Sequence, residues 1–330
     1  MKDYIMKFIH FITYHMYQAK RMSKDKVDKY LLKYYASQQT NFSQTSKTTL
    51  VFMVDGRILH GGLSDRLRGM VSIYLYAKAH GYDFKIYHRY PFMLEDFLSP
   101  NEVDWHIEDS SMIYDLKYAS PVFVEDLNHT FGHYTEQRVL DSFIRDDGRQ
   151  YHVYSNIDLS GNSFHTYFDS LFKPSEMLKD SIMEEQALIG SPFVSFVFRF
   201  QQLLGDFKEG NYPTLHDVEK KALIEKSIAK IKTVLSEKYK DSDYLVTSDS
   251  QTFLERVSTE PGCHIISGRV VHMDYTIGEQ RNVYMKSFLD LFMLSKSEKI
   301  FLMYSTGMYK SGFAKRAALL GNVEYEEIKY

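Results

Sequence analysis

The stretch TTLVFMVDGRILHGGLSDRLRGMVSIYLYAKAHGYDFKIY, residues 48–87, decides the fold. It opens with an apolar, β-branched run at 48–54, which is typical of a buried strand. After a glycine-bearing turn, Ser64 can cap a helix with one apolar face, and Gly81 can end it. Residues 82–87 then form the next strand. A strand–helix–strand unit joins parallel strands, so this stretch predicts an α/β domain built on a parallel sheet.

The second half of the chain repeats this alternation more regularly. We expect strands at Phe193–Phe198, Tyr244–Thr247, His264–Ser267, Lys299–Tyr304 and Val323–Ile328. Helices are expected near 250–258, 281–295 and 309–320, and a longer one is opened by Thr214-Leu-His-Asp217, which has the form of a capping box. The pattern predicts a second doubly wound domain.

The length of the chain fits two such domains. At 330 residues it exceeds the roughly 100 to 200 residues of an ordinary domain. We therefore expect an N-terminal segment and linker at 1–45, an N-terminal α/β domain at 46–190 and a C-terminal α/β domain at 191–330. Strand candidates within 91–190 are fewer, at 121–124 and 151–154.

The composition excludes several classes of protein. Forty Lys and Arg residues against 43 Asp and Glu give a net charge of -3, so no global basic field exists to attract nucleic acid. A single cysteine, Cys263, can form no internal disulfide and leaves no pair for a structural zinc site. We expect a reducing, cytoplasmic compartment and no metal site. Asp241-Ser-Asp243 precedes a strand, so we interpret it as a solvated turn.

The N-terminal segment is apolar at its start and basic after that. Residues 4–17 are apolar but are interrupted by Lys7, His10 and His15, which fits neither a membrane-spanning helix nor a signal peptide. Closely spaced lysines follow as far as Lys33. Residues 1–35 could therefore lie on the inner face of an anionic membrane as an amphipathic helix. The alternative is a helix that packs on the protein's own body.

Polar residues follow three strands of the predicted C-terminal domain. Arg199 ends the first strand, Ser248 and Asp249 follow the second, and Ser305 and Thr306 follow the strand at 299–304. Ligands of open parallel sheets bind beyond the carboxyl ends of the strands. We therefore expect these residues to share one pocket, where the forked arginine suits a phosphate or diphosphate. Each taken alone could equally belong to an ordinary turn.

The N-terminal domain offers a glycine-rich turn between its first strand and helix. Gly61 and Gly62 let a ligand approach the backbone, and Asp65 and Arg66 lie in the first helical turn. The turn carries neither the dinucleotide pattern G-x-G-x-x-G nor a P-loop. A plain tight turn remains an equal alternative.

These pieces, in this order, resemble the fucosyltransferase superfamily, which includes α1,2-, α1,6- and protein O-fucosyltransferases and bacterial relatives. The resemblance covers about residues 48–322. It rests on four segments: His60-Gly-Gly-Leu-Ser-Asp-Arg-Leu67, Val197-Phe-Arg-Phe200 with Gly205-Asp206, Val246-Thr-Ser-Asp249, and Asp290-Leu-Phe-Met-Leu-Ser295 followed by Phe301-Leu-Met-Tyr-Ser-Thr306 and Ser311-Gly-Phe-Ala314.

The resemblance implies a GT-B fold, in which the two domains face a cleft and the C-terminal domain holds the donor. It implies GDP-β-L-fucose as donor, transfer with inversion and without metal, and a glycan or glycolipid acceptor, as in polysaccharide biosynthesis. Arg199 would bind the β-phosphate and Asp249 the guanosine, while Ser305, Thr306 and Ser311 would contact the diphosphate. Across the cleft, His60 and Asp65 on the turn with Gly61 and Gly62 would face the sugar or acceptor. Asp206 and Glu209 are the candidate general bases.

Two other classes of function stay open. Phe198 replaces the His of the first motif, and about four extra residues separate Arg199 from Gly205-Asp206. Both departures fit a protein of the same fold that binds a nucleotide sugar or a glycan and has lost turnover. The other alternative is an unrelated Rossmann-type enzyme that takes a phosphate-bearing ligand.

Overall fold

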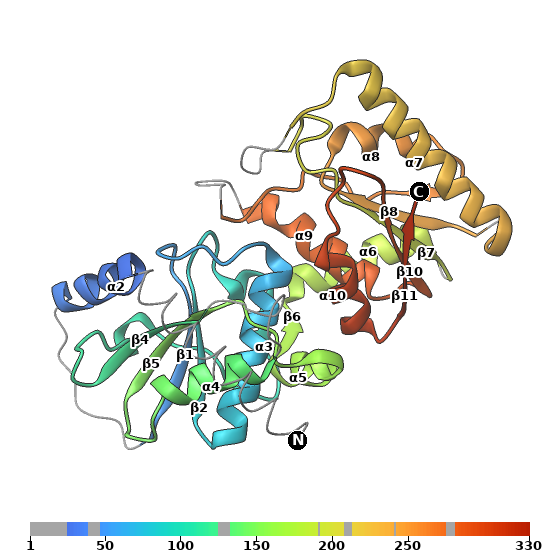
Figure 1. Ribbon diagram of the computed structural model, residues 1–330. Coiled ribbons are helices and arrows are strands. Elements are labelled where there is room, and N and C mark those ends of the chain that lie inside the picture. Colours follow the sequence, from blue (N-terminus) through green and yellow to red (C-terminus); the bar gives the residue numbers. More distant parts are fainter. Residues whose placement is uncertain are drawn as a thin grey trace, which may run out of the picture. The chain divides into compact units, whose positions relative to one another are not determined.

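The computed structural model describes residues 25–38, 47–124, 133–190, 192–207, 213–240, 242–274 and 281–330. The chain divides into two compact units (Figure 1). The first unit comprises residues up to Gly61, Asp65–Tyr90 and Pro100–Phe172, and the second comprises Gly62–Ser64, Pro91–Ser99 and Lys173–Tyr330.

The elements alternate along the chain as an α/β fold requires. The α-helices are α2 (Asp25–Ser37), α3 (Leu63–His80), α4 (His133–Phe143), α5 (Phe164–Leu171), α6 (Glu176–Ile189), α7 (Asp217–Lys238), α8 (Gln251–Val257), α9 (Arg281–Leu294) and α10 (Gly312–Gly321). The strands are β1 (Thr49–Val54), β2 (Asp83–His88), β3 (Leu98–Pro100), β4 (Ala119–Val124), β5 (Gln150–Ser155), β6 (Phe172–Pro174), β7 (Val194–Phe198), β8 (Tyr244–Ser248), β9 (Cys263–His264), β10 (Lys299–Tyr304) and β11 (Glu324–Lys329).

The first unit is built on a parallel sheet with strand order β2-β1-β5-β4. The predicted strand–helix–strand unit is confirmed as β1, α3 and β2. Helix α3 comes close to the sheet at Gly69, where a Cβ atom would stand 2.5 Å from the Ser155 carbonyl oxygen and 2.9 Å from the Phe52 ring. Glycine is therefore needed here for close packing.

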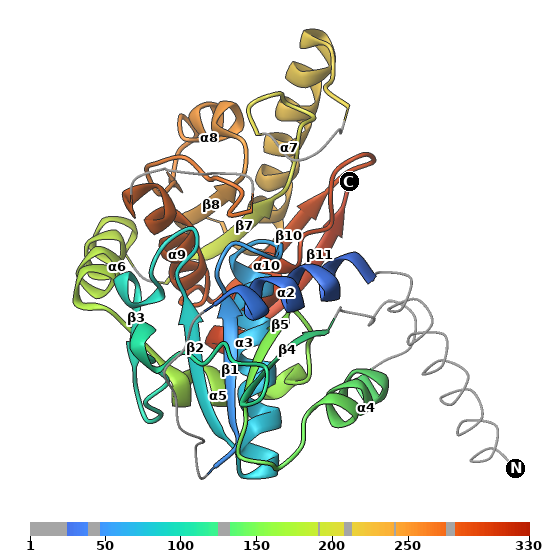
Figure 2. The same ribbon diagram turned by 90° about the vertical axis from the view of Figure 1, so that its left-hand side faces the viewer.

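Helix α2 packs on the opposite face of this sheet (Figure 2). Leu31 is buried in a cluster with Val51 and Met53, whose side chains alternate with that of Phe52 along β1. The hydroxyl of Tyr35, also buried on α2, hydrogen-bonds to Nδ1 of His152 in β5. Within the described part of the N-terminal segment, the helix therefore packs on the protein's own body, whereas residues 1–24 lie outside the described residues.

The second unit has a parallel five-stranded sheet in the order β11-β10-β7-β8-β9. Helices α7 and α8 cover one face, where Ile228 and Phe253 pack with Phe196, Phe198 and neighbouring core residues. Helices α6, α9 and α10 lie on the other face (Figure 1). The chain runs outward from β7 through β8 to β9 and then crosses to β10 and β11 on the other side. The doubly wound prediction is confirmed, with its switch point between β7 and β10.

Some boundaries differ from those expected. Helix α7 begins at Asp217 because the Glu219 side chain accepts a hydrogen bond from the His216 backbone N–H at 3.0 Å, so the cap lies two residues later than Thr214. Strand β9 pairs with β8 only through Cys263 and His264 and does not reach Ser267. The long C-terminal segment of the second unit starts at Lys173, and Gly62–Ser64 and Pro91–Ser99 belong to the same unit.

Candidate functional site

The sheet order brings the three predicted strand ends side by side. Strands β10, β7 and β8 are neighbours, so the residues after them share one edge of the second unit. Arg199 and Ser305 flank the switch point, where loops of a doubly wound sheet diverge and leave room for a ligand.

Asp249 lies at the centre of this edge. Its carboxylate is buried, and Oδ1 accepts a hydrogen bond from the Phe200 backbone N–H at 2.8 Å while Oδ2 accepts one from Gln201 at 2.7 Å. Oδ2 also lies 3.4 Å from Nε of Arg199. Burial raises the pKa of Asp249 to about 6, and the Arg199 guanidinium and the two N–H groups oppose the rise. The carboxylate thus holds the turn after β7, whereas the resemblance implies contact with guanosine.

The turn itself is strained at one residue. Gln201 has φ of 53°, in the left-handed region, which costs an L-residue roughly 1–2 kcal/mol. Hydrogen bonds to a charged partner contribute about 1.5–3 kcal/mol each. The two bonds to Asp249 therefore outweigh the strain and keep the turn in this conformation.

Arg199 is held on several sides. Besides its ion pair with Asp249, its guanidinium carbon lies 4.4 Å from the centroid of the Phe207 ring. Its backbone carbonyl accepts a hydrogen bond from the Tyr309 N–H at 3.2 Å, which ties the loop after β10 to the turn after β7. The Arg199 side chain is 18% exposed, so it is confined yet reaches the surface. This combination suits an anion-binding group.

The candidate base Asp206 is engaged at the start of α8. Its Oδ2 accepts hydrogen bonds from the Ser250 hydroxyl at 2.9 Å and from the Thr252 backbone N–H at 2.7 Å. It therefore satisfies donors at the beginning of this helix. Glu209, the other candidate base, lies outside the described residues.

The three residues expected at a diphosphate on the loop after β10 differ in exposure. The Ser305 hydroxyl is buried, donates to the Tyr330 carbonyl at 2.8 Å and accepts from Nζ of Lys226 at 3.4 Å. Thr306 is exposed, and Ser311 caps α10 by accepting from the Phe313 N–H at 3.2 Å. Of the three residues expected at a diphosphate, Thr306 is thus exposed, Ser311 partly exposed and Ser305 buried.

Three further residues lie near this edge without any signal in the sequence. Phe207 lies under Arg199, and the ring of His272 lies 6.4 Å from that of Phe207. Nδ1 of His272 accepts from the Asp274 N–H at 3.2 Å, which places the proton of a neutral ring on Nε2. Lys226 is contributed by α7. None of the three stands at a strand end or in a motif, so only the packing reveals them.

In the first unit, the glycine-rich turn is fixed by Arg66. This buried side chain donates from Nε to the Gly61 carbonyl at 3.1 Å and from Nη1 to the Tyr90 carbonyl at 2.8 Å. Gly61 has φ of 83°, and a Cβ atom there would collide with the Asp65 carboxylate. A Cβ atom on Gly62 would meet nothing within 4 Å. Asp65 is partly exposed and pairs with Arg68 at 3.2 Å.

His60 lies inside the first unit. It is 2% exposed, and its ring lies 5.9 Å from that of Phe52 and 6.2 Å from that of Tyr154. Burial, with a contribution from the Arg66 guanidinium, lowers the pKa of His60 to about 3, so the ring is neutral at pH 7. This placement supports the turn from within, whereas the resemblance implies that His60 faces a sugar or acceptor.

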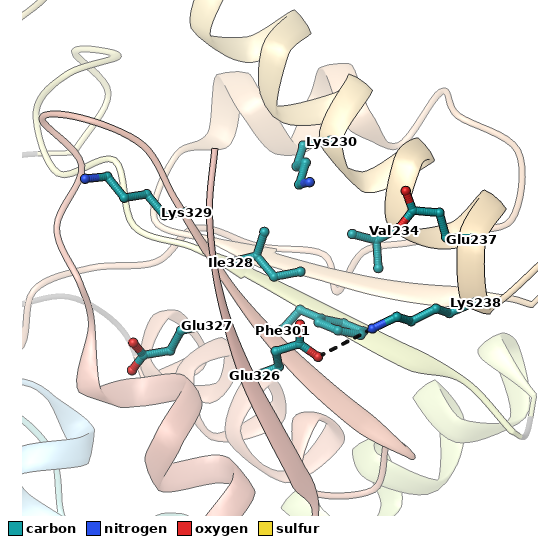
Figure 3. A pocket seen from close by; sticks show the side chains of 9 residues that line it. All are labelled: Lys230, Val234, Glu237, Lys238, Phe301, Glu326, Glu327, Ile328 and Lys329. Atoms are coloured by element: carbon teal, nitrogen blue, oxygen red, sulfur yellow. Dashed lines mark ion pairs between the residues drawn. The ribbon is translucent and has the colours of Figure 1, made fainter.

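A cavity of about 280 Å³ lies elsewhere on the second unit, between α7 and β11 (Figure 3). Val234, Phe301 and Ile328 line it together with charged residues, among which Lys238 and Glu326 stand 4.0 Å apart. Its lining includes none of the strand-end residues that were expected to form the site.

Two findings concern other kinds of site. In the part of the chain that the structure describes, no group of three or more His, Cys, Asp or Glu side chains is arranged to hold a metal ion. Among the same residues, no helix combines the length and apolarity needed to span a bilayer.

Solved structures share this architecture. The NodZ α-1,6-fucosyltransferase co-crystallised with GDP is 13% identical, with a TM-score of 0.52, and the match covers 84% of this chain and 93% of that chain. NodZ from Bradyrhizobium is 12% identical, with a TM-score of 0.51 over 84% of this chain and 94% of that one. POFUT1 in complex with GDP is 11% identical, with a TM-score of 0.51 over 87% and 99%. The chain has the fold of the GT-B fucosyltransferases.

The likeness is one of fold. No protein-family model matches the chain, and neither does any curated protein sequence. At identities of 11–13% the backbone arrangement is shared while most side chains differ. The chemistry must therefore be argued from this chain's own residues.

Proposed function

We propose that this protein is a glycosyltransferase that moves L-fucose from GDP-β-L-fucose to a hydroxyl of a glycan or glycolipid. The observation that carries the proposal is the confined Arg199 guanidinium at the switch point of the second unit. The shared fold with structures solved in complex with GDP supports the choice of nucleotide. Thr306 on the neighbouring loop supplies a further hydroxyl to the diphosphate.

In this reaction the acceptor oxygen attacks the anomeric carbon of the donor while the bond to the β-phosphate oxygen breaks. Negative charge grows on the departing GDP, and Arg199 stabilises that charge most strongly in the transition state. Attack opposite to the leaving group inverts the configuration and gives an α-fucoside. Asp206 and Glu209 are our candidates for the base that takes the acceptor proton.

We also propose that the reaction proceeds without a metal ion, because a fixed guanidinium can supply the positive charge that a divalent cation supplies in other transferases. Activity undiminished in excess chelator is the expected result. A strict requirement for a divalent ion would refute this part of the proposal.

The experiment that tests the nucleotide is a thermal-shift panel of GDP, UDP, CMP and their sugars, with and without chelator, since a ligand that binds the folded state raises its melting temperature. We expect a shift selective for GDP and GDP-fucose. GDP release in the presence of candidate glycans then reports turnover. Selective GDP binding with no transfer would favour the protein that has lost turnover, and no response to GDP would favour an unrelated phosphate-ligand enzyme.

A further inference from the structure

The Asp249 carboxylate uses its hydrogen-bonding capacity within the protein. Each of its oxygens accepts a backbone N–H, Oδ2 also faces Arg199, and the side chain is only 1% exposed. A guanosine could reach these oxygens only if the turn after β7 opened. Asp249, which follows β8, thus acts on the candidate site through the turn after β7.

The turn that Asp249 holds has the geometry of an anion-binding nest. Successive backbone N–H groups that converge on one point form such a nest, and here those of Phe200 and Gln201 converge on one carboxylate, with Gln201 in the left-handed region. In this chain the protein's own carboxylate occupies the nest formed by Phe200 and Gln201. The strained turn is therefore formed around a fixed negative charge.

The same carboxylate orients the arginine. Arg199 immediately precedes the nest, so the backbone that carries its side chain is fixed by the two N–H bonds. Its Nε faces Oδ2 at 3.4 Å, and Phe207 covers the guanidinium at 4.4 Å. Removing the carboxylate would take away both backbone hydrogen bonds and the ion pair, while the Phe207 contact and the hydrogen bond from Tyr309 would stay.

We propose that Asp249 is a positioning residue for the donor diphosphate: it folds the turn after β7, aims Arg199 at the phosphate, and itself makes no contact with the nucleotide. This inference rests on the proposed function for the identity of the donor. It assigns Asp249 a role that differs from a guanosine contact and that can be measured separately.

Protonation of Asp249 should weaken the arrangement. A neutral carboxylic acid accepts hydrogen bonds less strongly and offers Arg199 no charge. The charged and titratable groups around this turn include Arg199 itself, Asp206, which accepts hydrogen bonds at the start of α8, and His272, whose ring lies beside that of Phe207. The contribution of Asp249 must therefore be distinguished from that of the neighbouring His272 by substitution.

The decisive experiment compares two probes by calorimetry, GDP and inorganic pyrophosphate, on the wild type and on Asp249→Asn. A positioning role predicts that both probes lose affinity by a similar factor of about 10 or more, because both depend on Arg199. A guanosine contact predicts that only GDP is affected. Loss of GDP affinity with pyrophosphate binding intact, or no loss of either, would overturn the proposal.

Two further variants sharpen the test. Asp243→Asn changes an exposed carboxylate at the other end of β8 and serves as the matched control, with both affinities expected to stay at the wild-type value. Gln201→Gly introduces a residue that adopts a left-handed conformation without strain. Combined with Asp249→Asn, it should restore part of the lost pyrophosphate affinity. The acid weakening of GDP binding should persist in His272→Gln and disappear in Asp249→Asn.

A ligand-free measurement separates this inference from the proposed function. Hydrogen exchange of the Phe200 and Gln201 amides should be slow in the wild type and at least 10-fold faster in Asp249→Asn, with circular dichroism confirming that the variant is folded. If the wild type binds neither probe, the proposed function fails while the exchange result still tests the role of Asp249 in the turn. Unchanged exchange would refute that role.

Discussion

Replacement of Arg199 by alanine should weaken GDP binding while the protein remains folded. The guanidinium lies at the switch point, between an ion pair of 3.4 Å with Asp249 and the Phe207 ring at 4.4 Å. A charge-assisted contact with a phosphate contributes about 1.5–3 kcal/mol. At 1.36 kcal/mol per tenfold change, the dissociation constant should rise roughly 10- to 150-fold.

The assay is isothermal titration with GDP at pH 7.5, accompanied by urea unfolding of each variant. Arg199→Lys keeps the charge but loses the planar fork, so its affinity should fall between those of the wild type and the alanine variant. Arg256→Ala provides the control, because Arg256 pairs with Glu225 and Glu260 on the surface of the same unit. A folded Arg199→Ala protein that binds GDP as tightly as the wild type would refute the reasoning.

Three other outcomes follow from the packing and electrostatics. Gly61→Ala should lower the free energy of unfolding by about 1–3 kcal/mol, because φ is 83° and the new methyl would meet Asp65, whereas Gly62→Ala should change it by less than about 0.5 kcal/mol in the same urea titration. Leu31→Ala should cost about 3 kcal/mol if α2 is an integral part of the first unit, and a cost near zero would contradict its packing. The pKa of Asp249 is raised from 3.8 to about 6 in the folded protein, so the unfolded state releases that proton at lower pH. This group should therefore lower the free energy of unfolding by about 3 kcal/mol as the pH rises from 4 to above 6. Urea unfolding at pH 4.5 and 7.5 should show this decrease in the wild type but not in Asp249→Asn. An equal decrease in both proteins would contradict the prediction.

The fold could be predicted largely from periodicity. Buried strands such as 49–54 and 299–304 are continuous apolar runs bounded by polar turns, and the helices between them show one apolar face. Strand β9 was overestimated because Ile265 and Ile266 extend the apolar run, although ladder pairing with β8 ends at His264. The pattern of apolar residues indicates which segments are buried, but it indicates only indirectly which residues pair by hydrogen bonds in a sheet.

The shared edge at which the candidate site residues lie was predictable, whereas the direction of their polar atoms was not. Strand order places Arg199, Asp249 and Ser305 at one edge, and topology alone suffices for that prediction. The direction of each polar atom depends on neighbours far along the chain. Asp249 bonds to residues 48 and 49 positions earlier, and Ser305 bonds to Tyr330, 25 positions later. Such pairings leave no local signal in the sequence.

The two units stabilise their central turns in the same way, which argues for a general role of the buried acids. In the first unit Asp55 follows β1 and accepts from the Arg57 N–H at 3.0 Å, from the Arg57 guanidinium at 2.7 Å and from the Tyr154 hydroxyl at 2.8 Å. In the second unit Asp249 accepts two backbone N–H groups, where Asp55 accepts one, and it too faces an arginine. Each carboxylate fixes an arginine at the carboxyl edge of a parallel sheet. A carboxylate at a strand end of such a fold can therefore shape the site without meeting the ligand, and Asp249→Asn is the variant that distinguishes the two roles.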